Sequence, residues 1–577
     1  MGIDRVYRSI RTGVIFLAAI VSAVAGEGTA LTTPEVGRYA ATPVRDSGFP
    51  KDAMPLYTAR LLAAINLPGT LAATDHLLDA ALGAKLDPFH LHAIVHSERV
   101  GGERWPEALR AKFRAYAARW DFTKPIGVSL NYELMRDGAG WIAAGVWPDL
   151  IDAAGNSAER IRQLCGDRLR KTLAALPLEG ATEYDAPLYY GTDFMALRLL
   201  VDFADEPDLR DAARRALEGM LVQTAAHWHR GYAITSAGRA KYWGSQQVSP
   251  DAPGATTAMA WMLFGGDRDA HIEGVPQGFW FTYPSPWLAS LGPLKSWHAT
   301  LPVPRNVRAS VLIPSHRFFV RKQAWITADY GLASQRTDGT PANSYLYKET
   351  RNVVLRWVSP KPASTFIVFQ ENRHRPTEQI ANAFAYGENP YAQTLQHEGT
   401  VLGVYDVPAD YGFHRVIAPF TTRGAIVSRI ERDGWICTHG GSVLFAFRTL
   451  TPATWLTPDH KEGLDLYATA PDCRRGGWIL ETAPPARYPA ASPAAALEAF
   501  AADMTARTRA TLNLAVTPLR LTFTNFDGYT LDLTWKPPAA AYAGECRVNG
   551  RPVDYSVFPL LDILDSGSRT IALPALN

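Results

Sequence analysis

The sequence predicts two domains, an N-terminal (α/α) toroid followed by a C-terminal antiparallel β-sandwich. Apolar residues recur at helical spacing from about Asp46 to Gly265, and the helices that they predict come in pairs. From about Gly278 onward, short β-rich runs alternate with turn signals. Repeated helix pairs are typical of a toroid or solenoid, and regularly spaced short strands without helices between them are typical of a sandwich.

The helical half contains one clear helical hairpin. It runs from Thr192 to Phe203, turns at 204–207 and returns from Asp208 to His227. Within the turn, Asp205 is a suitable N-cap, and Gly231 suits the C-terminal stop of the second helix. The same spacing predicts further helices over Pro55 to Ile65, Leu71 to Leu82 and Pro106 to Trp120.

The strand-rich half is divided by Asp-Gly and Asn-Gly pairs, which favour tight turns. These pairs stand at 338–339, 433–434, 527–528 and 549–550. Predicted strands include 310–313, 325–327, 352–357, 365–369, 401–405, 443–447, 519–523 and 529–533, and one helix, Pro493 to Arg507, interrupts them. We therefore expect a signal peptide at 1–25, the toroid at 26–275 and the sandwich at 276–577.

The first 25 residues have the pattern of a secretory signal peptide. Arg5, Arg8 and Arg11 precede a short apolar run at 13–21, and 23–25 reads Ala-Val-Ala, a small-residue cleavage site. The run is too short for a membrane span with these flanks. The sequence thus predicts a secreted or periplasmic protein without a membrane span.

The composition is that of a globular protein without a nucleic-acid footprint. The chain has 577 residues, 47% of them hydrophobic and 20% charged, and its net charge is +2. The four cysteines stand far apart, without a C-x-x-C pair, so no zinc knuckle is predicted. Export would permit a Cys437–Cys473 or a Cys473–Cys546 disulfide, and buried free thiols fit equally well.

Residues 227–244 form the stretch with the most unusual composition. His227 and His229 are followed by Arg230 and Tyr232, and then by the segment 238–244, which reads Gly-Arg-Ala-Lys-Tyr-Trp-Gly. An ordinary helix end and the loop after it do not need this mixture. Cations, imidazoles and phenols together suit a site that holds an acidic sugar and moves a proton.

Two other patches carry matching residue types. Ser129 to Glu133 reads Ser-Leu-Asn-Tyr-Glu just before a predicted helix, and Asn131 within it could also be a helix cap. Glu183 to Gly191 is predicted to be a loop that leads into a helix. Its Tyr189 and Tyr190 could stack on sugar rings or pack the loop.

With these patches and this domain order, the chain resembles the toroid-plus-sandwich polysaccharide lyases, which include the chondroitin AC and hyaluronate lyases and the heparinase II/III-like and alginate lyase families. In those lyases an Asn holds the uronate carboxylate, and a His, a Tyr and an Arg lie close together. The resemblance implies catalytic roles for Asn131, His229, Arg239 and Tyr242. It implies substrate contacts for Glu133, Tyr189, Tyr190, His227, Arg230, Lys241 and Trp243.

The chemistry of β-elimination accounts for these residue types. The C5 proton of a uronate is very weakly acidic while the neighbouring carboxylate is charged, so amide and cationic donors must stabilise the charge that develops. One tyrosine can remove the C5 proton and then protonate the departing C4 oxygen if its pKa is lowered. His227 and Tyr232 remain alternatives to His229 and Tyr242, and the mechanism needs no metal or other cofactor.

Two other functions remain open from the sequence. A glycoside hydrolase on an α/α toroid would use a carboxylate pair, for which Glu133, Asp137, Glu183 and Asp185 are candidates. A non-catalytic glycan-binding protein would need only the aromatic side chains. The sandwich histidines His316, His374 and His397 could hold a structural divalent metal if the fold brought them together. Arg230, Arg239 and Lys241 favour the lyase, with an acidic polysaccharide as the partner.

Overall fold

The computed structural model describes most of the chain after residue 32. The described residues are 33–44, 49–126, 129–179, 181, 184–187, 189–238, 254–267, 272–313, 318–337, 352–371, 389–412, 414–456, 463–537 and 545–574. The predicted signal peptide at 1–25 lies outside them.

The chain divides into two compact units. Unit 1 consists of the described residues within Met1–Ala174, Thr192–Leu217 and Ile272–Gly292. Unit 2 consists of the described residues within Ala175–Gly191, Glu218–His271 and Pro293–Asn577. The chain therefore passes between the units several times before the strand-rich region begins. The domain boundary between 275 and 276 stays a prediction.

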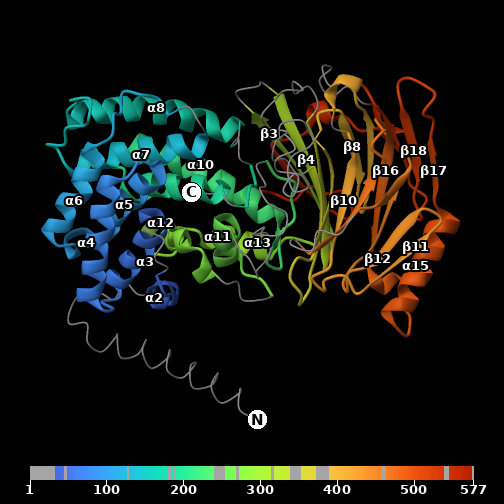
Figure 1. The fold of residues 1–577 in the computed structure, drawn as a ribbon, viewed down its shortest axis with the longest axis horizontal. Coiled ribbons are helices and arrows are strands. Elements are labelled where there is room, and N and C mark those ends of the chain that lie inside the picture. Colours follow the sequence, from blue (N-terminus) through green and yellow to red (C-terminus); the bar gives the residue numbers. More distant parts are fainter. Residues whose placement is uncertain are drawn as a thin grey trace, which may run out of the picture. The chain divides into compact units, whose positions relative to one another are not determined.

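The predicted order, helices first and antiparallel strands second, is confirmed (Figure 1). The helices are α2 (Pro34–Ala41), α3 (Pro50–Leu62), α4 (Leu67–Gly83), α5 (Pro88–Gly101), α6 (Glu107–Ala118), α7 (Leu130–Val146), α8 (Ala158–Glu179), α9 (Tyr189–Phe203), α10 (Pro207–His227), α11 (Ala255–Phe264), α12 (Pro286–Ser290), α13 (Gly292–Ala299) and α15 (Pro493–Arg507).

Helices α3 to α7 of unit 1 pack in two layers. Helix α5 contacts both α3 and α7, while α4 contacts α6. Alternate helices thus lie side by side, as in an array of helical hairpins. The central helix α5 is buried along most of its length, and Asp87 caps it by accepting a 2.8 Å hydrogen bond from the N–H of Phe89.

The hairpin of α9 and α10 is confirmed, with a different cap. Helix α10 begins at Pro207, so Glu206 occupies the cap position. Asp205, one residue earlier, instead accepts two hydrogen bonds from Arg162 at 2.8 and 2.9 Å. Helix α10 ends at His227, as predicted.

Unit 2 contains three large sheets in which every pairing among the described strands is antiparallel. The nine-stranded sheet has the order β14 (Ala453–Trp455), β15 (Leu464–Thr469), β10 (Val416–Thr421), β7 (Thr365–Gln370), β6 (Val353–Trp357), β5 (Tyr330–Arg336), β4 (Phe318–Ile326), β3 (Arg305–Ile313) and β22 (Leu561–Asp565). The six-stranded sheet has the order β11 (Ser428–Arg432), β12 (Trp435–His439), β13 (Leu444–Thr449), β16 (Arg475–Ala483), β9 (Thr400–Asp406) and β8 (Ala392–His397).

The third sheet has five strands in sequence order: β17 (Arg509–Leu512), β18 (Arg520–Thr524), β19 (Thr530–Thr534), β20 (Glu545–Val548) and β21 (Arg551–Pro552). Three of the predicted Gly-containing turns lie at hairpins: 433–434 in the six-stranded sheet, and 527–528 and 549–550 in the five-stranded sheet. The fourth, 338–339, lies outside the described residues. Asp433 and Gly434 have φ of 49° and 79°, and Asn549 and Gly550 have φ of 49° and 75°. These positive values fit two-residue hairpin turns.

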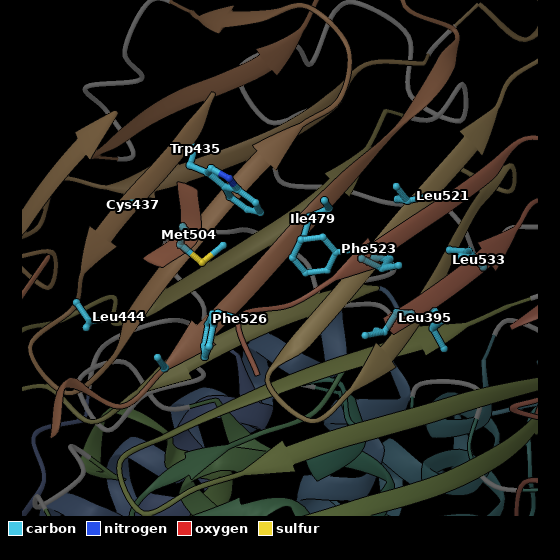
Figure 2. Close-up of a cluster of buried hydrophobic side chains, with 14 of the residues drawn as sticks. Leu395, Trp435, Cys437, Leu444, Ile479, Met504, Leu521, Phe523, Phe526 and Leu533 are labelled. Atoms are coloured by element: carbon cyan, nitrogen blue, oxygen red, sulfur yellow. The ribbon is translucent and has the colours of Figure 1, made fainter. Parts of the chain in front are cut away.

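The six-stranded sheet is the middle layer of unit 2, because both of its faces are buried. Along β12, Ile436 belongs to the core shared with the nine-stranded sheet, while Trp435 and Cys437 belong to the core shared with the five-stranded sheet and α15. Figure 2 shows the second core, with Phe523 and Met504 among its side chains. The strand period of two thus supplies apolar residues to both cores.

The described cysteines and helices bear on two of the sequence-based expectations. All four cysteines lie in the described residues and are free thiols, so neither of the disulfides considered from the sequence is formed. Among the helices of the described ranges, none combines the length and the hydropathy that a membrane span needs.

Candidate functional site

The stretch after His227 folds as a short β-hairpin instead of the predicted loop. Strands β1 (Trp228–His229) and β2 (Tyr232–Ala233) pair antiparallel, and Arg230 and Gly231 form the turn between them. Their φ values of 52° and 96° are those that a two-residue hairpin turn requires. Of the two histidines, only His227 is therefore on the helix.

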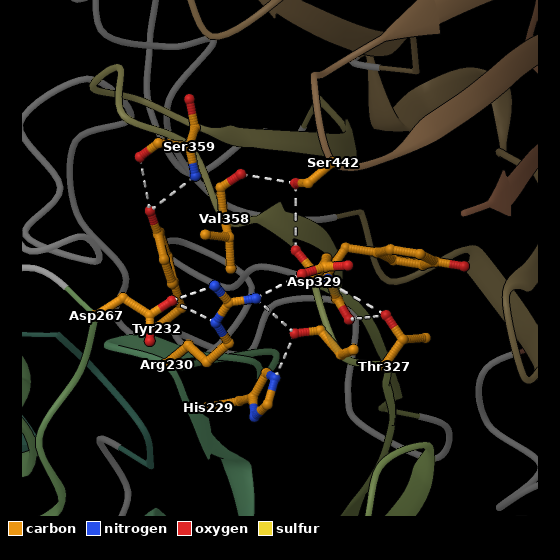
Figure 3. A network of polar contacts seen from close by, with 11 residues as sticks. His229, Arg230, Tyr232, Asp267, Thr327, Asp329, Val358, Ser359 and Ser442 are labelled. Carbon is orange, nitrogen blue, oxygen red and sulfur yellow. Dashed lines mark hydrogen bonds and ion pairs between the residues drawn. The ribbon is translucent and has the colours of Figure 1, made fainter. Parts of the chain in front are cut away.

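The hairpin is fastened to the turn between β4 and β5 (Figure 3). His229 Nε2 donates to the carbonyl oxygen of Ala328 at 2.8 Å. The Arg230 guanidinium forms ion pairs with Asp267 and Asp329 and also donates to the Ala328 carbonyl at 3.1 Å. Burial lowers the pKa of His229. These contacts give Arg230 and His229 a role in holding the hairpin.

Trp228 and Tyr232 anchor the hairpin from its buried side. Trp228 is fully buried and donates from Nε1 to the Gly265 carbonyl at 2.7 Å. Tyr232 is 3% exposed, and its hydroxyl lies 3.4 Å from both the backbone N and O of Ser359. Tyr232 is therefore a packed side chain of the hairpin core.

His227 is buried and keeps one ring nitrogen unengaged. Its Nδ1 donates to the carbonyl oxygen of Gln223 at 2.8 Å, so in the neutral ring Nε2 carries the lone pair. Nε2 has no hydrogen-bond partner among the described residues. Burial, together with the positive charge of Lys322, lowers the pKa of His227 to about 4, against the opposing influence of Asp185. His227 is thus uncharged at neutral pH, and its Nε2 can accept a hydrogen bond.

Asp185 and Lys322 form a buried ion pair beside His227. The Lys322 ammonium contacts Asp185 Oδ2, which also accepts a 2.8 Å hydrogen bond from the Thr235 hydroxyl. Their side chains are 5% and 1% exposed. Burial alone would raise the pKa of Asp185, but Lys322 and His227 outweigh it and the pKa is lowered. Asp185 has φ 50°, a strained conformation for a residue other than glycine.

The loop that contains Asp185 also binds the described residues on both sides of 239–253. The Gly238 N–H donates to the Tyr184 carbonyl at 3.0 Å. On the other side, the Thr256 hydroxyl donates to the Ala186 carbonyl at 2.7 Å, and the Thr256 N–H donates to the Pro187 carbonyl at 3.1 Å. The second and third sequence patches therefore meet in unit 2.

Four of the predicted site residues, Arg239, Lys241, Tyr242 and Trp243, lie outside the described residues. Tyr189 and Tyr190 begin helix α9, where Tyr190 is 2% exposed and Tyr189 is half-buried. Their aromatic rings are thus partly to fully packed at the start of the helix that follows the Asp185 loop.

Asn131 belongs to unit 1 and lies inside α7, where Ser129 occupies the cap position. The Ser129 hydroxyl donates to Asn131 Oδ1 at 2.7 Å, which fixes the orientation of the amide. Asn131 is fully buried, and its Nδ2 has no hydrogen-bond partner among the described residues. An unsatisfied buried donor is costly, which points to a role in binding an acceptor.

The acidic residues near Asn131 differ in their surroundings. Glu133 is half-buried, and burial followed by the charge of Asp137 raises its pKa. Asp137 accepts hydrogen bonds from Arg136 at 2.7 Å and from Arg168 at 2.8 and 2.9 Å. The charge of the Asp137 carboxylate is thus balanced by two arginines. Glu133 forms no ion pair with an arginine or a lysine of the described residues.

No metal or cofactor site emerges from the described residues. No group of three or more His, Cys, Asp or Glu side chains among them is arranged to hold a metal ion. Of the sandwich histidines, His316 and His374 lie outside the described ranges, as does Glu183 of the candidate acids. His397 stands at the turn between β8 and β9.

The sequence did not indicate Lys322 or Thr235 as parts of the site. Lys322 lies on β4, 137 residues from Asp185, and no local pattern links the two. The one signal was Asp185 itself, which stands in a loop rich in tyrosine and was considered only as a catalytic acid.

Comparisons with known proteins give a likeness of fold. No protein-family model matches the chain, and no curated protein is significantly similar to it. A solved structure of Streptomyces coelicolor A3 chondroitin AC lyase in complex with chondroitin sulphate is 12% identical, with a TM-score of 0.42, over 89% of this chain and 86% of that one. A mutant of the same lyase is 10% identical, with a TM-score of 0.39, over 91% and 89%. Both are lyases of the kind that the sequence resembles.

Proposed function

We propose that this protein is an exported polysaccharide lyase that cleaves a uronic-acid-containing polysaccharide by β-elimination. The observation that carries the proposal is the meeting of two sequence patches in unit 2. Tyr184 and Thr256 tie the residues that flank 239–253 to the loop of Asp185 and Tyr189. Gly238 and Thr256, the described residues nearest to Arg239 and Tyr242 in the sequence, thus both contact this loop.

Asn131 supports the same reaction class independently. Its amide is oriented by Ser129, and Nδ2 is a buried donor without a partner among the described residues. A donor of this kind suits the carboxylate of a uronate, whose charge grows as the C5 proton leaves. We assign Asn131 and Arg239 to that carboxylate, with Glu133, Tyr189 and Lys241 among the further contacts to substrate.

We assign the proton transfers to Tyr242. In the proposed reaction the Tyr242 phenolate takes the C5 proton, the electron pair forms the C4–C5 double bond, and the C4–O bond breaks. The same tyrosine then returns the proton to the departing oxygen. The products are an unsaturated uronate and a new chain end, and no metal or other cofactor takes part.

The histidine of the reaction is assigned with the help of the tautomer. His229 is favoured by its position in the sequence, but its Nε2 donates to Ala328. His227 has a free Nε2 lone pair, and its pKa of about 4 keeps the ring uncharged at neutral pH, so it can accept a hydrogen bond from a phenol. We therefore propose His227 as the hydrogen-bond acceptor that orients the Tyr242 hydroxyl, with His229 in a supporting role at the hairpin.

The hydrolase alternative has less support from the candidate acids. Asp137 is held by two arginines, and Asp185 is held by Lys322 and Thr235. A carboxyl group fixed as an ion-paired anion is a poor proton donor. Of the candidate acids that the structure describes, Glu133, with its raised pKa, is the one that resembles a general acid, and a hydrolase needs a second carboxylate opposite it.

The test is the Tyr242→Phe variant with Tyr232→Phe as the matched control. Purified protein is mixed with alginate, glucuronan, glycosaminoglycans and plant uronate gums, and the absorbance of the unsaturated uronate is followed near 235 nm. We expect turnover by the wild type, a loss of at least about 1,000-fold in Tyr242→Phe, and less than about threefold change in Tyr232→Phe. Substrate binding should survive both changes.

The opposite result would redirect the assignment. Full activity in Tyr242→Phe removes this tyrosine from the reaction. New reducing ends without absorbance would mean hydrolysis, with Glu133 as the first acid to replace. In the same assay, His227→Ala should be less active than His229→Ala if His227 orients the Tyr242 hydroxyl.

A further inference from the structure

A second site is built at one end of the sheets of unit 2. A cavity of about 330 Å³ is lined by the β8–β9 turn, the end of β16, the β18–β19 turn and the β4–β5 turn. This volume lies in the range of small-molecule pockets. The residues that give it its chemistry are Trp325, His397, Glu398, Glu481, Arg487 and Asp527.

Glu481 contributes a buried carboxyl group that forms no ion pair with a cation of the described residues. It is 1% exposed, and its two oxygens lie 3.0 and 2.9 Å from the Thr400 hydroxyl. That hydroxyl has one proton and also accepts a hydrogen bond from Asn525 at 3.2 Å. Burial, followed by the charge of Asp527, raises the pKa of Glu481 well above its ordinary value. Glu481 is therefore a neutral group that can both donate and accept.

His397 adds an acceptor on the next strand turn. Its ring packs against Tyr529 with ring centres 4.7 Å apart. The Nε2 atom is buried and has no hydrogen-bond partner among the described residues. Burial lowers the pKa of His397, so the ring is uncharged at neutral pH.

The rim of the cavity is rigid and its charges are mostly paired. Asn525 Oδ1 accepts the backbone N–H groups of Asp527 and Tyr529 at 3.0 and 2.9 Å, which fixes the β18–β19 turn. Asp527 pairs with Arg487 at 2.6 Å. Glu398 remains as the further acid, and burial raises its pKa. Arg487 is the one Lys or Arg side chain among the described lining residues and it is paired, so the lining offers an anionic ligand no unpaired cation.

Trp325 provides an aromatic wall for the same cavity. It is half-buried at the end of β4, so part of the indole remains accessible. The apolar face of a sugar ring packs on an indole, while its hydroxyl groups need neighbours that donate and accept. Glu481 and His397 are neighbours of this kind.

We propose that this cavity binds a neutral sugar ring, which stacks on Trp325 and hydrogen-bonds to Glu481 and His397. The proposal is independent of the lyase reaction. Thr327 and Tyr330 line the cavity, whereas Ala328 and Asp329 between them bind the β1–β2 hairpin through His229 and Arg230. The cavity is therefore a different site from the hairpin, and its ligand differs in charge from a uronate.

The experiment is a titration of the full-length protein, followed by saturation-transfer NMR. The probes are the methyl glycosides of glucose, galactose and N-acetylglucosamine, with methyl glucuronide as the anionic counterpart. We expect saturable binding of at least one neutral probe and at least tenfold weaker binding of methyl glucuronide. Trp325→Ala should weaken the neutral probe at least tenfold, while Trp455→Ala, a tryptophan of β14 outside the cavity, should leave it unchanged.

A second variant covers the case in which Trp325→Ala disturbs β4. His397→Ala lies on another turn and removes only the acceptor, so we expect binding at least threefold weaker with an unchanged circular dichroism spectrum. The proposal fails if no neutral probe saturates, if methyl glucuronide binds as well as the neutral probes, or if binding is the same in Trp325→Ala and His397→Ala.

Discussion

Asp185 and Glu481 are two buried carboxyl groups of unit 2 that are held in opposite charge states. The Asp185 side chain is 5% exposed, contacts Lys322 and has a lowered pKa. Glu481 is 1% exposed, has the Thr400 hydroxyl as its neighbour and has a pKa raised well above its ordinary value. Burial acts on both in the same direction, so the difference comes from the cation.

The comparison separates two uses of a buried acid. Beside His227, Lys322 holds Asp185 as an anion. Removing either member of this ion pair leaves the other buried without its partner. In the cavity, a neutral carboxyl group can offer a proton and a lone pair to a ligand without a charge. Removing a partner should therefore be costly in the first case and mild in the second.

The largest expected effect is that of Lys322→Met. The change leaves Asp185 as an uncompensated buried charge, which costs about 3–5 kcal/mol. We expect a corresponding decrease in the free energy of unfolding of unit 2, measured by urea denaturation at pH 7. The double variant Lys322→Met/Asp185→Asn should recover most of the loss, because Asn is neutral and tolerates the positive φ of this position. A loss below about 1 kcal/mol in the single variant would mean that Asp185 is not held charged.

A smaller effect is expected from His227 and depends on pH. Its folded-state pKa of about 4 lies below the ordinary 6.5, so its contribution to stability is present above pH 6.5 and is lost as the pH falls toward 4. The loss at pH 5 should be about 2 kcal/mol. His227→Gln cannot titrate, so its local stability should change by about that much less between pH 8 and pH 5.

Hydrogen exchange of peptides from residues 218–238 measures this local stability. Peptides from α5, where His92 also has a pKa lowered to about 4 by burial, serve as the internal control. Their pH dependence should be the same in the wild type and in His227→Gln. Equal pH dependence of the 218–238 peptides in both proteins would show that His227 is already protonated or exposed near pH 6.

The sequence predicted the fold better than the contacts of the site. Periodicity located α10, α15 and most strands within a few residues, since it depends on which side chains must be buried locally. The hairpin after His227 was read as a loop because its turn depends on the positive φ of Arg230, a residue that rarely adopts it. The unusual composition of the segment was real, but Arg230 and Tyr232 are engaged in fastening the hairpin.

Long-range contacts explain why the rest could not be predicted. Asp185 and Lys322 are 137 residues apart, and Glu481 and Thr400 are 81 apart. The register of β9 and β16 brings Thr400 and Glu481 together, whereas Lys322 on β4 meets a residue of a loop, and no local pattern reveals either contact. The sequence therefore located Asp185 and the histidines as candidates but not Glu481, and their charge states followed only from the neighbours that the fold provides.

The smallest expected effect is that of Glu481→Gln, and its sign distinguishes the two carboxyl groups. The folded-state pKa of Glu481 lies above the ordinary 4.5, so its contribution is fully present below that pH and is lost as the pH rises through the folded-state value. Gln does not ionise and keeps a donor and an acceptor. We expect the variant to be within about 1 kcal/mol of the wild type at pH 5 and to become the more stable protein as the pH rises.

Asp185→Asn, the same chemical change, should lose stability at every pH above 5 because it leaves Lys322 buried without its partner. Urea denaturation of the three proteins at pH 5, 7 and 9 makes the comparison. If Glu481→Gln falls below the wild type by a margin that grows with pH, as an ion-paired acid would, then Glu481 is charged in the folded protein and the contrast with Asp185 is removed.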